Sequence, residues 1–532
     1  MDVKRGALLA AILGSTVVAV DATVVNVALP TIADELGGGL AGQQWVANAY
    51  LLTLSSLILV SGSLSDLYGE RRVFTLGVAG FGLTSLLCAL APSVELLVVA
   101  RALQGVSGAL LTPASLAIIV AVFPVSERGA AIGSWTAWGG IGYLVGPLVG
   151  GQLVDAASWR WVFALNVPLV LVTLVLASRF VPPGRDLGEA RPRLDLTGAL
   201  LCAIGLAGVS FGLIEQPVLG WSDPAVMVPL AAGVLTCAAF VVFERRTPAP
   251  MLPLDLFGRR NFTVANVETF AMYGGMAVQS FFLVLFLQQV AGFSALEAGS
   301  AGLFPTLVMF FLSRRFGALA DRHGPRWFMT AGPLLVAAGF LLLLRLDATT
   351  SYFGDLAPSL IVYSLGLAMT VSPLTATVLA DADESDAGIA SAVNNAVART
   401  AGLLATAAVG AILATSYAAR LDDAIAGRPL SSAGHARVAA ARDRALSPVD
   451  TAGLPPGDRA VVARAVRDAG VETFHLAALI GAAMLAAAGL MGGLLLRNPR
   501  RPTAAERCPG GQLIGAPEEA GQARAASEPA AA

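Results

Sequence analysis

Two short stretches of the chain repeat each other and decide its architecture. The first reads Gly62-Ser-Leu-Ser-Asp66-Leu-Tyr-Gly69-Glu-Arg71-Arg72, and the second reads Gly317-Ala-Leu-Ala-Asp321-Arg-His-Gly324-Pro-Arg326. Both follow the pattern GxxxDxxGxR and match at one offset of 255 residues. Each lies between two long apolar runs, so we interpret them as corresponding turns of two related halves. Either copy alone could be only a well-capped tight turn, in which glycine supplies a positive φ and Asp caps the next helix.

The composition around these turns indicates a membrane protein. Of 532 residues, 56% are hydrophobic and only 13% are charged, about half the charged share of a soluble domain. The 34 Lys and Arg against 36 Asp and Glu leave no excess basic charge for binding nucleic acid. The four cysteines have no CxxC or CxxH neighbours, which argues against metal sites and disulfides. We expect a polytopic protein of the plasma membrane, with the lipid bilayer as its solvent.

Long apolar runs predict where the chain crosses the bilayer, because a helix needs about 20 largely apolar residues to do so. Fourteen runs qualify: 7–29, 42–64, 73–92, 95–123, 130–153, 161–181, 196–215, 226–243, 262–290, 296–313, 327–346, 356–380, 388–414 and 474–496. Arginine gathers in alternate short loops and near the N-terminus, so the positive-inside rule places both termini in the cytoplasm. Residues 415–473 form a long external loop, which escapes that rule. Residues 497–532 are expected to be a disordered cytoplasmic tail.

The repeated turns divide these spans into two halves. If the second span corresponds to the tenth, residues 1–181 form an N-terminal half and residues 261–496 form a C-terminal half. Residues 182–260 then hold two inserted spans and their linkers. Two six-helix halves related by an axis along the membrane normal are a known plan of secondary transporters, which rock one half against the other around a midplane site. The expected fold is all-α, with two six-helix bundles and two inserted central helices, fourteen in total.

Ionisable residues within the spans are costly there and are therefore candidates for function. They are Asp21, Arg101, Glu268 and Arg399. Counted along their helices, Asp21 and Arg101 lie at the same depth, roughly 9 Å from the outer face, and are plausible partners. We expect Asp21 to take up and release a proton while Arg101 modulates its pKa; a static ion pair is the alternative. Glu268 is either a cavity-facing proton or cation site, or a structural partner of Arg399.

The chain resembles the major facilitator superfamily, specifically its fourteen-span drug:proton antiporter branch, up to about residue 496. Asp21-Ala-Thr-Val-Val-Asn26-Val-Ala-Leu-Pro30 is similar to the first-span signature of that branch. Arg101-Ala-Leu-Gln104-Gly105-Val-Ser-Gly108 is similar to a fourth-span motif whose arginine is implicated in proton transfer. The resemblance also implies that the repeated turn is a cytoplasmic gate, in which charge interactions of Asp and Arg stabilise one conformation. The matching charged residues are Asp66, Arg71, Arg72, Asp321 and Arg326.

The fifth span indicates the direction of transport. Gly142-Tyr-Leu-Val-Gly146-Pro147-Leu-Val-Gly150-Gly151 matches the superfamily's antiporter motif GxxxGPxxGG. Physical chemistry alone assigns this pattern only close, bendable helix packing. The resemblance to the motif favours export over import.

The resemblance implies a proton-coupled antiporter that exports drugs or amphipathic natural products by alternating access, as in antibiotic resistance. We expect it to use the proton gradient, to need no cofactor or metal, to act as a monomer and not to be an enzyme, since neither a catalytic constellation nor a GxxxxGK[ST] motif is present. A proton-coupled importer of a small metabolite and a membrane sensor or channel are the alternatives; the duplicated turn argues against a channel. The candidate residues of a substrate cavity are Asn26, Gln104, Tyr273, Gln279 and Arg399.

Overall fold

The computed structural model describes residues 2–183, 195–248, 250–380, 387–442, 444–447 and 449–498. The described residues up to Leu496 form one compact unit. Apart from residues 497 and 498, the predicted tail lies outside the described residues. Every regular element in the described ranges is a helix.

The N-terminal half consists of helices at the first six predicted spans. Its innermost helix is α1, which packs against α2, α4, α5 and α7. Local sequence sets some of the helix ends: the Ser93 hydroxyl accepts a hydrogen bond from the backbone N–H of Leu96 and so caps the start of α4. The elements are α1 (Val3–Leu36), α2 (Gly39–Tyr68), α3 (Glu70–Ala89), α4 (Val94–Val122), α5 (Val125–Ala156), α6 (Arg160–Ala164) and α7 (Asn166–Phe180).

Two further helices, α8 (Leu196–Leu219) and α9 (Pro224–Glu244), form the predicted inserted pair. Asp195 and Asp223 cap them, with carboxylates that accept hydrogen bonds from backbone N–H groups of the first turn. The two helices pack closely because glycines face each other: a Cβ on Gly208 would lie only 2.9 Å from Cα of Gly233. The pair contacts both halves, because α8 packs against α2 and α15.

The C-terminal half repeats the plan of the N-terminal half. Its innermost helix, α10, packs against α14, α15 and α17, as α1 packs against α4, α5 and α7. The elements are η1 (Leu254–Gly258), α10 (Arg260–Leu285), η2 (Phe286–Val290, one π-helical turn), α11 (Ala295–Ser300), α12 (Leu303–His323), α13 (Arg326–Leu342), η3 (Leu343–Arg345), η4 (Tyr352–Leu356), α14 (Ala357–Ala380), α15 (Ala387–Ile425), α16 (Ser432–Arg442) and α17 (Pro456–Leu495).

The two repeated turns have the same backbone conformation. Gly69 ends α2 with φ 85° and ψ 137°, and Gly324 ends α12 with φ 88° and ψ 150°. These angles lie in a region that residues with a Cβ rarely adopt, which explains why glycine occupies both positions. The offset found in the sequence therefore corresponds to a structural repeat.

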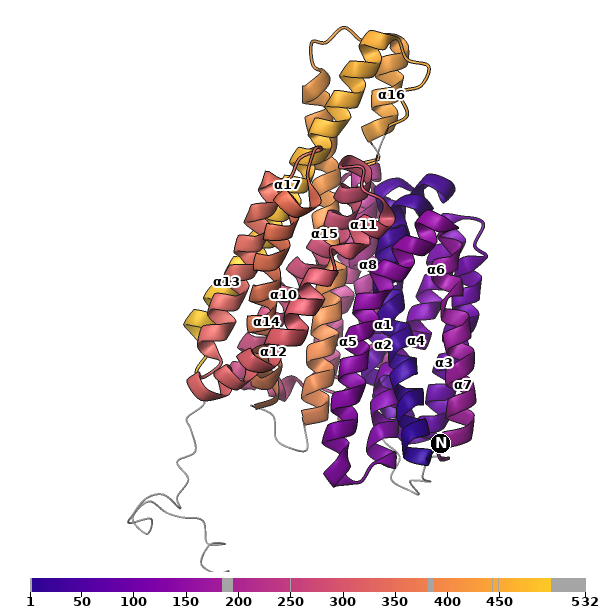
Figure 1. The fold of residues 1–532 in the computed structure, drawn as a ribbon, viewed down its shortest axis with the longest axis vertical. Coiled ribbons are helices and arrows are strands. Elements are labelled where there is room, and N and C mark those ends of the chain that lie inside the picture. The colour runs from indigo at the N-terminus through magenta and orange to yellow at the C-terminus, as the bar shows by residue number, and fades with distance from the viewer. Residues whose placement is uncertain are drawn as a thin grey trace, which may run out of the picture. The chain divides into compact units, whose positions relative to one another are not determined.

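The segment 415–473, which we expected as a loop, is largely helical. It contains the end of α15, all of α16 and the start of α17, and we call its described residues the cap. Alanine, the strongest helix former, is frequent here. The side chains of Tyr417, Leu421, Val438 and Val462 form a buried core within it. In Figure 1 the cap projects beyond the other helices at the end of the bundle opposite the N-terminus. We call these two ends the cap end and the N-terminal end.

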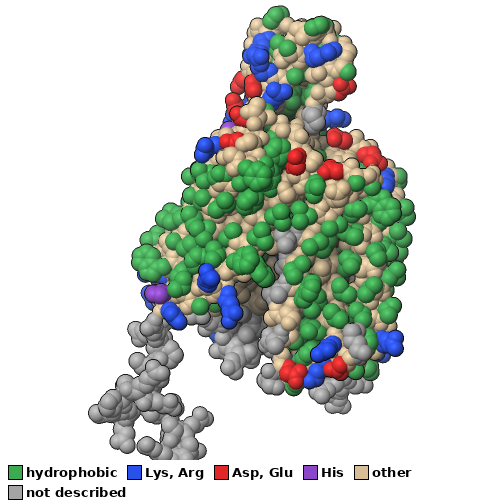
Figure 2. Space-filling view, in the orientation of Figure 1, with side chains coloured by type: hydrophobic (Ala, Val, Ile, Leu, Met, Phe, Trp, Pro, Cys, Tyr) green, Lys and Arg blue, Asp and Glu red, His purple; other side chains and the backbone are tan. Residues whose placement is uncertain are grey.

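The described helices are suited to a bilayer. Twelve helices or consecutive helix pairs are long and apolar enough to cross a membrane. Figure 2 shows hydrophobic side chains around the middle of the bundle and charged ones toward its ends. Large apolar residues such as Leu76 and Leu83 on α3, and Leu90 just after it, are more than 60% exposed, as expected of groups that face lipid. The chain is a multi-pass membrane protein. The twelve coincide with predicted spans; the other two predicted spans coincide with α2 and α5.

Candidate functional site

A buried ion pair joins α1 and α4. The Nη1 atom of Arg101 lies 2.6 Å from Oδ2 of Asp21, and the two side chains are 2% and 0% exposed. Glycine brings α4 close to α2 beside this pair, since a Cβ on Gly105 would lie 2.3 Å from the backbone oxygen of Tyr50. The two residues that the sequence placed at one depth with opposite charge are therefore in contact.

Two amides complete the coordination of the Asp21 carboxylate. Nε2 of Gln104 donates to Oδ1 at 2.9 Å, and Nδ2 of Asn166 donates to the same oxygen at 3.0 Å. The hydroxyl of Ser85 on α3 accepts from both amides, at 2.8 and 3.3 Å. Four helices of the N-terminal half thus meet at Asp21, whose charge is balanced by one guanidinium and two amide donors.

The Arg101 guanidinium is held from several sides. Nε donates to the backbone oxygen of Val46 at 3.1 Å, and Nη1 also donates to Oε1 of Gln104 at 2.6 Å. Its central carbon lies 4.3 Å from the centre of the Tyr50 ring, within the range of a cation–π contact. Removal of the Asp21 charge would leave this buried cation without its counter-ion, so the protonation of Asp21 and the packing of α4 are linked.

This network includes residues that sequence reasoning placed elsewhere or missed. Gln104 was expected to line a substrate cavity; instead it is fully buried beside Asp21. Asn166, Ser85 and Tyr50 were not predicted as site residues. Asn166 could have been found, because it is an amide in the apolar run 161–181, where an unpaired polar group is costly.

Glu268 on α10 lies in a different environment. It is fully buried, and neither oxygen of its carboxyl group has a hydrogen-bond partner. A Cβ on Gly492 would lie 2.9 Å from Oε2, so the carboxyl group faces α17 rather than an open cavity. In the described chain Glu268 forms no ion pair with Arg399, and Nε of Arg399 lacks a hydrogen-bond partner. The pairing with Arg399, one of the two alternatives for Glu268, is thus not found among the described residues.

The other cavity candidates do not gather around the Asp21 network. Asn26 is half-buried on α1, Tyr273 and Gln279 lie on α10, and Arg399 lies on α15. A separate polar contact joins α10 to α15, where Nδ2 of Asn394 donates to Oγ1 of Thr269 at 2.8 Å.

The arginines of the repeated turns have equivalent partners. Nη2 of Arg71 donates to the backbone oxygen of Ser178 near the end of α7, at 2.7 Å. Nε of Arg326 donates to the backbone oxygen of Gly493 near the end of α17, also at 2.7 Å. In each half the turn is thus fastened to a carbonyl of the sixth helix, where a cation also interacts favourably with the helix dipole. The side chains of Asp66 and Asp321 lie outside the described part of the structure.

The glycines of the fifth-span motif pack α5 against α1. A Cβ on Gly142 would lie 3.1 Å from Cβ of Ala19. A Cβ on Gly146 would lie 2.2 Å from Oγ1 of Thr23, and one on Gly150 would lie 2.3 Å from Cγ2 of Val24. The stripe therefore serves close helix packing within the N-terminal half.

The same motif also contacts the C-terminal half. A Cβ on Gly151 would lie 2.5 Å from Cα of Leu296, and one on Gly299 would lie 2.5 Å from the backbone oxygen of Pro147. The carboxylate of Asp155 accepts hydrogen bonds from the backbone N–H groups of Ala295 and Leu296, at 3.1 and 2.9 Å. The end of α5 is thereby fixed to the start of α11.

Further hydrogen bonds join the halves at the same end. Nε2 of Gln44 on α2 donates to the backbone oxygen of Thr406 on α15 at 2.6 Å, and Nε2 of Gln288 on η2 donates to that of Val27 on α1 at 3.0 Å. All these contacts lie in the cap-end parts of their helices. Toward the N-terminal end, the surface in Figure 2 is hollowed between the halves. The structure is closed at the cap end.

Two repeated helical halves that are joined at one end, with a buried charge pair inside the first of them, define a secondary transporter. The comparisons with known proteins agree with this class. Residues 11–406 match the Major Facilitator Superfamily. The chain belongs to this superfamily, as the resemblance implied, and is a transporter and not an enzyme.

Curated relatives carry the names of resistance and export proteins. The puromycin resistance protein pur8 of Streptomyces alboniger is 37% identical, over 76% of this chain and 81% of its own length. The tetracenomycin C resistance and export protein of Streptomyces glaucescens is 34% identical, over 85% of this chain and 84% of its own. The multidrug resistance protein Stp of Mycobacterium tuberculosis is also 34% identical, over 78% of this chain and 77% of its own length.

Solved structures share the fold. A bacterial homologue of the human lysosomal transporter Spinster, in an inward-facing and unoccupied conformation, superposes with a TM-score of 0.64 at 17% identity, covering 94% of this chain and 99% of that one. The xylose transporter XylE of E. coli gives a TM-score of 0.57 at 15% identity, and the match covers 93% of this chain and 97% of that one.

Proposed function

We propose that this transporter exports antibiotics or related amphipathic drugs in exchange for protons. The observation that carries the proposal is the buried network of Asp21, Arg101, Gln104 and Asn166, which places a titratable acid beside a fixed cation. The names of the curated relatives support export of a drug. The glycine motif of α5, which contacts both halves, supports an exchange mechanism that alternates between two closures.

We propose fourteen membrane spans, with both termini in the cytoplasm. Two observations support the count: α2 and α5 are 30 and 32 residues long, and they pack within the bundle against α4 and α1. The orientation rests on arginines at helix starts at the N-terminal end, such as Arg71 in the first turn of α3 and Arg128 in the first turn of α5. The cap end is then external, and the structure corresponds to an inward-facing state. A single chain contains both halves, so we propose that the monomer is the working unit.

In the proposed cycle, a proton enters from outside while the protein is outward-facing and removes the negative charge of Asp21. Arg101 then lacks a counter-ion in a buried place, which favours repacking of α4 and the helices around it in the change to the inward-facing state. Release of the proton to the cytoplasm from that state restores the ion pair of this structure. The contacts at the cap end, including those of Gly151 and Asp155, must break and re-form in each cycle. The motif turns act at the cytoplasmic end as the opposing gate.

We also propose Glu268 as a second proton site. Its carboxyl group has no hydrogen-bond partner, so no other group competes with a proton for its oxygens in this state. The surrounding contacts of α10 with α15 and α17 would transmit a change of its charge to the C-terminal half. The drug then contacts half-buried groups such as Asn26, Tyr273 and Arg399, together with Gln279.

The test uses inverted membrane vesicles and two drugs, puromycin and tetracenomycin C. Uptake of either drug into the vesicles should require a proton gradient and should stop when an uncoupler is added. Asp21→Asn should abolish gradient-driven uptake. The matched control is Asp34→Asn, which changes an exposed acid on the same helix outside the network and should leave uptake intact. Gradient-independent uptake, or full activity of Asp21→Asn, would contradict proton coupling; movement only in the opposite direction would favour an importer.

A further inference from the structure

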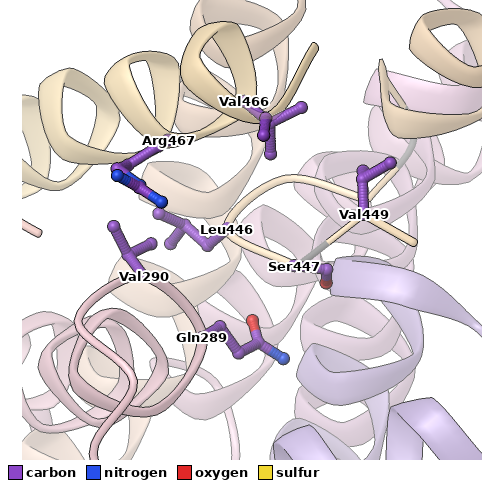
Figure 3. Close-up of a pocket in the computed structure, with 8 residues that line it drawn as sticks. Gln289, Val290, Leu446, Ser447, Val449, Val466 and Arg467 are labelled. Carbon is purple, nitrogen blue, oxygen red and sulfur yellow. The ribbon is translucent and has the colours of Figure 1, made fainter. Parts of the chain in front are cut away.

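A cavity of about 180 Å³ lies beneath the cap, within the C-terminal half. Its walls come from three places: η2, the loop that follows α16, and the part of α17 that belongs to the cap. Figure 3 shows the side chains of Gln289 and Val290 below, Leu446 in the middle, and Val466 and Arg467 above. The cavity is separate from the Asp21 network, and the proposed transport cycle does not use it.

Two polar side chains of this cavity, Gln289 and Arg467, have no polar partner among the described residues. Both the nitrogen and the oxygen of the Gln289 amide are buried and lack a hydrogen bond. A buried amide without partners costs free energy, and such groups in proteins usually bind something. Arg467, at the rim, forms no ion pair with a described residue. The cavity therefore presents amide donors, an amide acceptor and a guanidinium that the fold itself leaves unused.

Two backbone features at the walls are also uncommon. Gln289 lies in the π-helical turn η2, one of two π turns in the described chain, and π turns inside α-helices occur frequently at functional sites. Leu446 has a φ of 63°, the only positive φ of a non-glycine residue in the described chain. A branched side chain in this region is strained, and strain of this kind clusters at ligand sites. The amide and the strained loop face the same cavity.

The rest of the lining indicates what the ligand is. The side chains of Val290, Leu446, Val449 and Val466 are apolar, and an apolar cavity of comparable size, on the order of 150 Å³, accommodates one benzene ring. A guanidinium at the edge matches a carboxylate, which it can bind through two parallel hydrogen bonds. We propose that this cavity is a binding site for a small aromatic carboxylate, with the ring on the valines and the carboxylate between Arg467 and Gln289.

Occupancy of the site is linked to the closure of the transporter. Gln288, the neighbour of Gln289 in the same π turn, donates the hydrogen bond to Val27 of the other half. A ligand that fixes Gln289 also restrains Gln288 in that position. Such a ligand binds the closed cap end better than the open one and shifts the equilibrium toward it. The cavity is thus an external inhibitory site if the proposed orientation holds; the binding itself does not depend on the orientation.

The binding test uses the full chain in lipid nanodiscs and three ligands of one shape: benzoate, benzyl alcohol and benzylamine. Calorimetric titration should give a dissociation constant for benzoate roughly tenfold lower than for the other two, because only benzoate pairs with the guanidinium. Arg467→Gln should abolish this preference. Arg464→Gln, an exposed arginine one turn earlier on α17 and outside the cavity, should retain it. Equal binding of the three ligands, or an unchanged preference in Arg467→Gln, overturns the proposal.

A second variant tests the cavity without changing any charge. Ala463 lines the space, so Ala463→Leu fills part of it and should prevent benzoate binding while the protein remains folded. If the folded variant still binds benzoate with wild-type affinity, the ligand lies elsewhere and the proposal fails.

The link to closure has its own readout. Benzoate at the cap end should slow drug export by the wild type more than by Arg467→Gln. A general effect of a weak acid on the proton gradient would slow both proteins equally. If benzoate binds as expected and slows both equally, the coupling through η2 is wrong while the site stands. If no sample exports the drug, the proposed function is wrong, whereas the benzoate site is judged by the binding test alone.

Discussion

The two halves of this transporter have the same helix arrangement but differ in the surroundings of their buried acids. Asp21 and Glu268 each lie on the innermost helix of a half, and each is fully buried. Asp21 is bound by a guanidinium and two amides, whereas neither oxygen of Glu268 has a partner. The repeated turns and helix contacts therefore give both halves the same scaffold, while only the N-terminal half surrounds its buried acid with charged and amide partners. Four sets of substitutions test this contrast, from the largest expected effect to the smallest.

Arg101→Met should cause the largest loss. It removes the counter-ion of a buried carboxylate, which costs about 3 to 5 kcal/mol in the free energy of unfolding. Thermal unfolding of the purified protein measures the effect. The double variant Asp21→Asn, Arg101→Met should be less damaged than Arg101→Met alone, because no buried charge is left. A single variant as stable as the wild type would mean that the pair contributes nothing to folding.

Asn166→Leu should cost about 3 kcal/mol, since it removes a hydrogen bond to a charged group and one to Ser85. The ion pair itself remains, so the variant separates the amide from the guanidinium. Chemical denaturation in detergent gives the magnitude. Asn395→Leu changes an exposed amide in the other half and should have little effect; similar losses in both variants would argue against a special role of the network.

Gly69→Ala and Gly324→Ala examine the part of the comparison in which the halves agree. Each substitution places a Cβ on backbone with φ near 85°, and each should cost about 2 kcal/mol. Equal losses in thermal unfolding would follow from the equal conformation of the two turns. If only one variant lost stability, the turns would be alike in shape but not in importance.

Glu268→Met should be the mildest change and of opposite sign. It replaces an unpartnered polar group by an apolar one of similar length and should stabilise the protein by about 1 kcal/mol. Gradient-driven drug uptake should nevertheless fall if the acid carries a proton, and Glu268→Gln should reproduce that fall. A loss of stability in Glu268→Met would mean that the carboxyl group has a stabilising partner in the folded protein.

The sequence was sufficient for the helices of the two halves and of the inserted pair, but not for those of the cap, and for one contact of the site. Each predicted apolar run coincides with a helix or a helix pair, because length and hydropathy are local properties. Counting along two helices was enough to place Asp21 level with Arg101. Ser85 and Asn166 could not be assigned in this way, because their approach to Asp21 depends on how α3 and α7 are rotated against α1. The same reason explains Glu268: its direction is set by the packing of α10 against α17.

The two arginine bonds of the repeated turns also set an order for biosynthesis. Arg71 binds a carbonyl 107 residues later in the chain, and Arg326 binds one 167 residues later. At ribosomal speeds of about 5 to 20 residues per second, these partners emerge roughly 5 to 20 s and 8 to 33 s after the arginines. The first bundle can therefore close while the second is still being made. The second must wait until the cap, which lies between Arg326 and Gly493 in the sequence, has been synthesised, so it stays open for longer.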